Sequence, residues 1–219
     1  MNKKHLIILC ALFISSMHAQ YNNKDGNRIG FFGGVNHMSV MGTNFDTKPG
    51  MGWTAGFQVR GNLYNDWSGV FGINFFESSF DIQGTNKFGG QEDVHYKMNG
   101  GQLKFLFSYN IIDNHLSFDI GPMLQFGDKL KIKENQEEIA LNNTYLVAKD
   151  IVDITKINGN IFVGVSGGIK RVKVLLNYTY GVNNFMNKLN KDEFLYQQNN
   201  GEKFKGHYGM ASAQLLVNL

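Results

Sequence analysis

The chain has 219 residues, of which 42% are hydrophobic and 13% aromatic, with 26 glycines and only 2 prolines. This composition fits one folded domain and argues against a disordered chain. The formal net charge is +3, and it becomes +1 if Lys3 and Lys4 leave with an N-terminal leader, so nothing suggests a nucleic-acid partner.

The first twenty residues, MNKKHLIILCALFISSMHAQ, have the pattern of a secretory signal peptide. Two lysines form the charged region, Leu6–Ile14 is apolar, and small residues lead to Ala19. We therefore predict a signal peptide over residues 1–19 and a single domain over 20–219. Cys10 is the only cysteine and lies inside the leader, so no disulfide is expected in the exported chain. No later stretch approaches 18 apolar residues, which excludes a helical membrane protein.

Eight segments after the leader are predicted to be strands, and none has a convincing amphipathic-helix pattern. Side chains alternate between the faces of a strand, and Val172–Val182 shows this alternation almost perfectly, with one apolar and one largely polar face. The fourth segment loses the alternation near Gly100 and Gly101, where we expect a bulge. In chain order the segments are Ile29–Met41, Trp53–Leu63, Trp67–Phe80, Tyr96–Asn110, Leu116–Ile132, Ile154–Ile169, Val172–Val182 and His207–Leu219.

The connections between these segments alternate in length. The short ones lie near Asn65, near Asp113 and at 170–171, and the long ones near 42–52, 81–95, 133–153 and 183–206. An up-and-down antiparallel barrel with short turns at one end and long loops at the other produces this alternation. An even number of strands is also what bacterial single-chain barrels require.

The composition of the two strand faces indicates which one meets lipid. The polar face is rich in Gly, Ser, Asn, Thr and Gln, with isolated charges at Arg60, Lys104 and Asp119. Such residues suit the packed interior of an eight-stranded barrel, whereas a solvated exterior would carry more Lys and Glu. The alternative is a secreted eight-stranded calyx, in which the aromatic residues are ordinary strand formers.

Aromatic residues lie where the apolar face ends, as in the interfacial girdles of membrane barrels. They are Tyr64, Trp67 and Tyr109 near the short turns and Trp53, Phe126 and Tyr180 towards the long loops. The sequence therefore predicts an all-β, eight-stranded, antiparallel transmembrane barrel in an outer membrane, with long loops outside and short turns in the periplasm. Eight strands leave a filled interior, which disfavours a diffusion pore.

The chain resembles the PorT-like outer-membrane β-barrel family over nearly all of its exported length. The resemblance rests on the order of IGFFGGVNHM, GWTAGFQVRGNLYNDWSGVFGINFF, LKFLFSYNIIDNHLSFDIGPML and VGVSGGIKRVKVLLNYTYGVNN. It implies an eight-stranded barrel in the outer membrane of a Gram-negative bacterium, and the name-giving member serves protein secretion. One departure is the C-terminal Leu219, where such barrels commonly have an aromatic residue.

We expect no enzymatic activity, cofactor or metal. A hydrolase needs a nucleophile, a base and a group that orients the base, but His37, His95, His115 and His207 are scattered over different strand ends. Ser39 lies two residues from His37 on one predicted strand. This spacing is common by chance, so it does not indicate a catalytic pair. The leading hypothesis is a non-enzymatic structural or surface-binding protein. The alternatives are an accessory subunit of a secretion or envelope complex and, third, a lipid-modifying enzyme.

The charges of the polar face give one specific prediction. Arg60 precedes one short turn and Asp119 follows another by a similar distance, so both should lie at the same height in the lumen. Because an isolated charge in a packed lumen is unfavourable, we predict that Arg60 and Asp119 form an ion pair, with Lys104 as a further candidate member.

Overall fold

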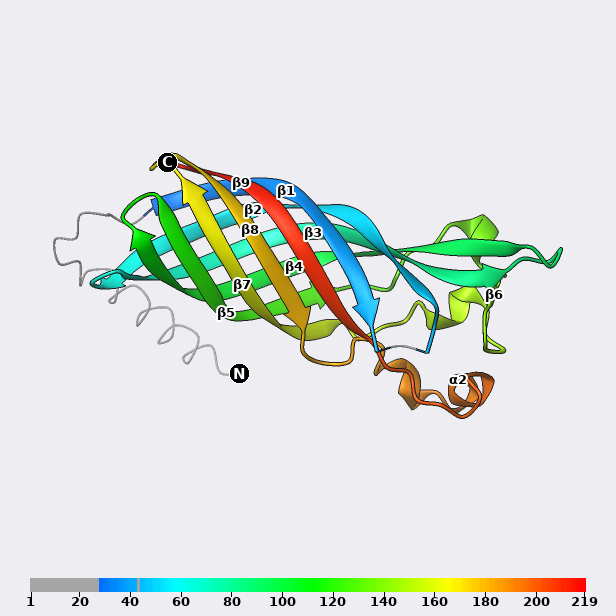
Figure 1. The fold of residues 1–219 in the computed structure, drawn as a ribbon. Coiled ribbons are helices and arrows are strands. Elements are labelled where there is room, and N and C mark those ends of the chain that lie inside the picture. The colour runs from blue at the N-terminus through cyan, green and yellow to red at the C-terminus, as the bar shows by residue number, and fades with distance from the viewer. Residues whose placement is uncertain (1–27, 43) are drawn as a thin grey trace, which may run out of the picture.

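The computed structural model describes residues 28–42 and 44–219 as one closed β-barrel with a cap of loops at one end (Figure 1). The predicted signal peptide, residues 1–19, lies outside the described residues. The ring order is β2-β1-β9-β8-β7-β5-β4-β3, and pairing of β2 with β3 closes it. The long strands are β1 (Arg28–Met41), β2 (Thr47–Tyr64), β3 (Trp67–Thr85), β4 (Gln91–Ile112), β5 (Leu116–Gly127), β7 (Ile157–Gly168), β8 (Val172–Gly181) and β9 (His207–Asn218). The predicted eight-stranded antiparallel barrel is confirmed.

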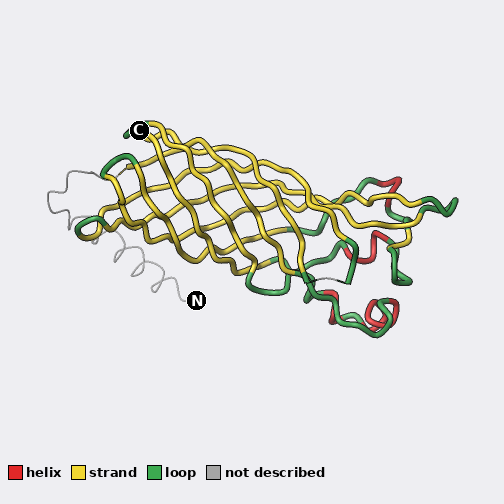
Figure 2. Tube along the Cα trace, in the orientation of Figure 1, coloured by secondary structure: helices red, strands yellow, loops and turns green. Residues whose placement is uncertain are grey.

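The short turns lie at one end of the barrel and the long connections at the other (Figure 2). Asn65 and Asn114 turn the chain with positive φ values of 50° and 63°, a conformation that asparagine tolerates better than most residues. At the opposite end β3 and β4 continue past the other strands and form a projecting arm. The long loops predicted over 81–95 and 42–52 are therefore wrong, since only residues 86–90 lie between β3 and β4 and only residues 42–46 between β1 and β2.

The other two long connections contain short elements of their own. They hold the two-residue strand β6 (Ala140–Leu141), which pairs with β3, and the 3-10 helices η1 (Glu134–Gln136), η2 (Ala148–Ile151) and η3 (Leu189–Lys191). They also hold the six-residue helix α2 (Glu193–Gln198), whose N-terminal amides are capped by the Asp192 carboxylate. This helix is too short to give the periodicity by which helices are predicted from sequence.

No helix in residues 28–42 and 44–219 has the length and apolarity needed to cross a bilayer.

The apolar face of the strands points outward, as predicted for a membrane barrel. On β8, Leu176 is 52% exposed, whereas Thr179 on the other face is 3% exposed. Trp67 stacks at a tilt against Tyr109, with 5.2 Å between the ring centroids, beside the short turns. Because the ring leaves no free edge, the strands satisfy their backbone hydrogen bonds within the barrel. The apolar belt on the outside is then compatible with the hydrocarbon of a bilayer.

The polarity of the two strand faces reverses at the long-loop end. On β4, Gln102 and Lys104 point into the lumen, but Met98 and Tyr96, which lie further along the same face, are buried in an apolar cluster. The outward Lys97 is exposed. The bulge predicted at Gly100–Gly101 is wrong, because β4 pairs with β3 through these residues without a register shift. The alternation slips in the sequence because the apolar face changes sides where the strand leaves the membrane.

Candidate functional site

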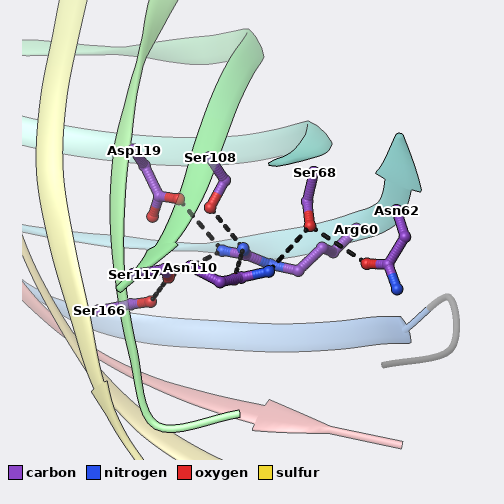
Figure 3. A network of polar contacts seen from close by, with 8 residues as sticks. All are labelled: Arg60, Asn62, Ser68, Ser108, Asn110, Ser117, Asp119 and Ser166. Carbon is purple, nitrogen blue, oxygen red and sulfur yellow. Dashed lines mark hydrogen bonds and ion pairs between the residues drawn. The ribbon is translucent and has the colours of Figure 1, made fainter. Parts of the chain in front are cut away.

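The layer of the lumen nearest the short turns contains Arg60 and Asp119. Arg60 projects from β2 and Asp119 from β5, and Arg60 Nη2 lies 3.1 Å from Asp119 Oδ1. The guanidinium also donates hydrogen bonds to the hydroxyls of Ser108 and Ser117, so several acceptors surround it (Figure 3). Asp119 is only 5% exposed. A buried charge without partners is strongly disfavoured, and the partners of Arg60 come from two strands, β4 and β5.

Lys104 occupies the next layer, apart from this pair. Its Nζ lies 4.0 Å from the centroid of the Phe32 ring and 5.5 Å from that of Phe162. Ring faces attract an ammonium group and replace part of the hydration that a 2% exposed side chain loses. Lys104 also borders a cavity of about 10 Å³, whose lining includes Asn177 and Gln214. That volume is at the lower limit of what one water molecule needs.

A chain of amide side chains crosses the lumen above Lys104. Asn74 donates to Gln102 over 2.7 Å, and Gln102 donates to Gln125 over 2.9 Å, which links β3, β4 and β5. The Tyr208 hydroxyl on β9 lies 2.8 Å from Gln125 Oε1 and 2.6 Å from Asn160 Oδ1, and its single proton serves one acceptor at a time. Together these side chains cross-link five strands across the lumen.

An apolar cap core lies above the amide chain and closes the mouth of the barrel. Phe80 and Tyr96 stack at its centre, with 5.5 Å between the ring centroids. From the strands it takes Met38, Val40, Phe76, Phe80, Ile82, Val94, Tyr96, Met98, Tyr208 and Met210. From the loops it takes Phe45, Leu130, Ile139, Leu141, Leu146, Ala148, Ile151, Ile154, Phe185, Met186, Leu189 and Phe204. Burial of this many apolar side chains fixes the loops to the barrel as a soluble core would.

Side-chain hydrogen bonds also fasten the loops to the strands. The Gln136 side chain imitates a neighbouring strand along the edge of β4, because its Nε2 donates to the Asp93 carbonyl and its Oε1 accepts from the His95 amide, at 3.0 and 3.2 Å. It therefore occupies backbone groups that would otherwise form an open edge. The Asn190 side chain likewise forms two hydrogen bonds with the backbone of Phe204.

An ion pair joins the loop before β7 to the loop before β9. Lys188 Nζ lies 2.6 Å from Asp153 Oδ1, and both side chains are partly exposed. The hydrogen bond from Lys188 holds the pKa of the Asp153 carboxyl below its ordinary value, with burial acting in the opposite direction. The charged pair is therefore stabilising at neutral pH.

The histidines of the described chain lie at separate places. His95 Nδ1 lies 2.6 Å from an Asp81 carboxylate oxygen on the projecting arm, and His207 Nδ1 lies 3.0 Å from the Gly181 carbonyl. His115 faces the carbonyl of Asp113 in a turn at the other end of the barrel. Over residues 28–42 and 44–219, no three His, Cys, Asp or Glu side chains are grouped so that they could hold a metal ion.

Sequence reasoning missed the cap core. Its loop members are isolated apolar residues among charges, as in the segment DKLKIKE, Asp128–Glu134, where Leu130 and Ile132 alternate with lysines. That alternation was the available signal.

The outer surface of the cap carries exposed aromatic side chains. Phe88 at the tip of the arm is 98% exposed, and Tyr145 and Phe194 are also exposed.

The closed ring, the apolar belt and the filled lumen together define an eight-stranded outer-membrane β-barrel. Among solved structures, the chain is similar to Neisserial surface protein A, with a TM-score of 0.50, 10% identity and coverage of 88% of this chain and 98% of that one. It is also similar to Ail, the attachment invasion locus protein of Yersinia pestis (TM-score 0.43, 12% identity, 89% and 99% coverage).

A third similar structure is the outer membrane protein OprG from Pseudomonas aeruginosa (TM-score 0.45, 8% identity, 89% and 97% coverage). At these identities the likeness concerns the fold alone. No family model and no curated protein sequence matches the chain.

Proposed function

We propose that the protein is a non-enzymatic surface-binding barrel that presents its capped loops at the cell surface. The observation that supports this function is the cap core, which holds the long loops in one arrangement. Binding residues are commonly carried on loops that a rigid scaffold positions, and rigid loops lose less conformational entropy on binding. The exposed aromatic residues Phe88, Tyr145 and Phe194 are candidate contact residues, since aromatic side chains are enriched at binding interfaces.

Site-specific photo-cross-linking on intact cells tests this proposal. A photoreactive amino acid replaces Phe88 or Tyr145 on the cap, and the control positions are Asn65 and Lys170 in the short turns. A surface-binding protein should give discrete cross-linked products from the cap and none from the turns. The proposal is refuted if the cap positions give no product on living cells under conditions in which the protein is folded and abundant.

The second candidate is an accessory subunit of a secretion or envelope complex, supported by the resemblance to the PorT-like family. The landmark segments of that resemblance lie on strands and short turns, for example FDIGP at Phe118–Pro122 on β5. This function predicts cross-links from Asn65 or Lys170 to periplasmic partners, together with stoichiometric co-purification after mild detergent extraction. A lipid-modifying enzyme would instead change the lipid A mass spectrum when the gene is deleted.

A further inference from the structure

The segment that follows β5 carries three lysines on one face. Between the pair Gly101–Phe126 and the pair Lys97–Lys131, β4 advances by four residues, whereas the segment that continues β5 advances by five. The extra residue is a bulge, and it reverses which side chains point outward. Leu130 and Ile132 therefore pack on the cap core, whereas Lys129, Lys131 and Lys133 point outward as one row.

The lysine row (Lys129, Lys131 and Lys133) lies directly above the lipid-facing belt. Phe126 and Ile157, on neighbouring strands, are exposed apolar residues of that belt. Lys131 pairs with Lys97, which is four residues beyond Gly101, the partner of Phe126. At about 3.3 Å per residue and a tilt near 40°, Lys131 lies about 10 Å above the Phe126 level. A lysine side chain extends far enough to lower its ammonium group into the headgroup region.

Nearby carboxylates leave the lysine row free for an external anion. Glu77 forms an ion pair with Lys97 at 3.2 Å, and Asp153 forms one with Lys188 at 2.6 Å. Within residues 28–42 and 44–219, none of the three lysines of the row has a carboxylate oxygen within 4.0 Å. The row is thus a line of positive charges without an ion-pair partner in contact, although the Lys129 charge also contributes to lowering the Asp153 pKa.

We propose that the lysine row binds the phosphate groups of lipid A in the outer leaflet. Lysine is a common phosphate ligand that acts as a point charge, and clustered basic residues near a membrane surface attract anionic headgroups. The row faces outward, above lipid, rather than into the cap, so the phosphate comes from the surrounding lipid and not from a soluble ligand of the loops. This contact is independent of whatever the exposed aromatic residues bind.

Binding of fluorescent lipid A to the full-length exported protein in zwitterionic detergent micelles tests the proposal. The probes are bis-phosphorylated lipid A and the same lipid after enzymatic dephosphorylation. The variant replaces all three lysines of the row by glutamine. Removal of three lysine–headgroup contacts of ordinary strength should lower the affinity for the phosphorylated lipid on the order of 100-fold. The affinity for the dephosphorylated lipid should change little.

The control removes the same number of charges from other exposed lysines of the cap, namely Lys87, Lys191 and Lys203. This control should bind like the unchanged protein, and arginine at the three row positions should restore binding. Equal affinity of the row variant and the unchanged protein would overturn the proposal, as would an equal loss in the control. Full competition by millimolar inorganic phosphate would show a free-phosphate site instead. Heat-modifiable migration on gels establishes that each variant is folded, and cross-linking from Phe88 remains a separate test of the proposed function.

Discussion

Replacing Asp119 by alanine should destabilise the barrel strongly, because it leaves the Arg60 guanidinium buried without its counter-charge. Loss of one partner of a buried ion pair costs about 3–5 kcal/mol. Ser108 and Ser117 remain as hydrogen-bond acceptors for Arg60, so we expect a loss near the lower end, about 3 kcal/mol, which is roughly 100-fold in the folding equilibrium. The exposed pair Glu77–Lys97 is the matched control, and Glu77→Ala should cost less than about 1 kcal/mol.

The assay is reversible unfolding by urea in lipid vesicles, followed by the fluorescence of Trp53 and Trp67. The double variant Arg60→Met with Asp119→Ala should recover much of the loss, because methionine fills a similar volume and carries no charge to bury. Strictly additive losses in the double variant, or an Asp119→Ala cost no larger than that of Glu77→Ala, would refute the reasoning.

Four further outcomes are expected. The protein should partition into membranes and migrate on gels in a heat-modifiable way, and its recovery as a detergent-free soluble monomer would contradict the barrel. Leu176→Arg should cost about 2–4 kcal/mol if it lies near the bilayer midplane, whereas Thr179→Ser should be nearly silent, and equal stability of the two variants would invert the assignment of the faces. Phe185→Ala should cost about 3–5 kcal/mol of cap stability and increase proteolysis of the loops while the membrane strands stay protected. The Asp153 pKa is lowered in the folded state, so its stabilising effect is present above the ordinary aspartate pKa and is lost as pH falls through the folded value. Proteolysis of the cap should therefore increase on acidification below about pH 4, with a smaller pH response in Asp153→Asn.

The local sequence pattern was sufficient to predict the barrel. Alternation of polar and apolar side chains, as in Val172–Val182, has a period of two residues, and it identifies a strand and its two faces without reference to any other part of the chain. The lengths of the connections then gave the up-and-down order, since short turns and long loops alternate. For the same reason the inward positions of Arg60, Lys104 and Asp119 followed from the sequence, because each keeps the phase of its own strand.

The tertiary structure decided what these faces meet. An apolar residue on the inward face can mean either a break in the strand pattern or a contact with the cap. Loops more than 30 residues away decide between the two, as Met98 and Phe185 show by packing in one cluster. The length of the arm, the strand-like role of Gln136 and the position of Lys104 over the Phe32 ring likewise depend on register and ring closure, which bring distant segments together. A two-residue period defines the direction of each side chain. Only the closed barrel determines whether that direction leads to lipid, to the lumen or to the cap core.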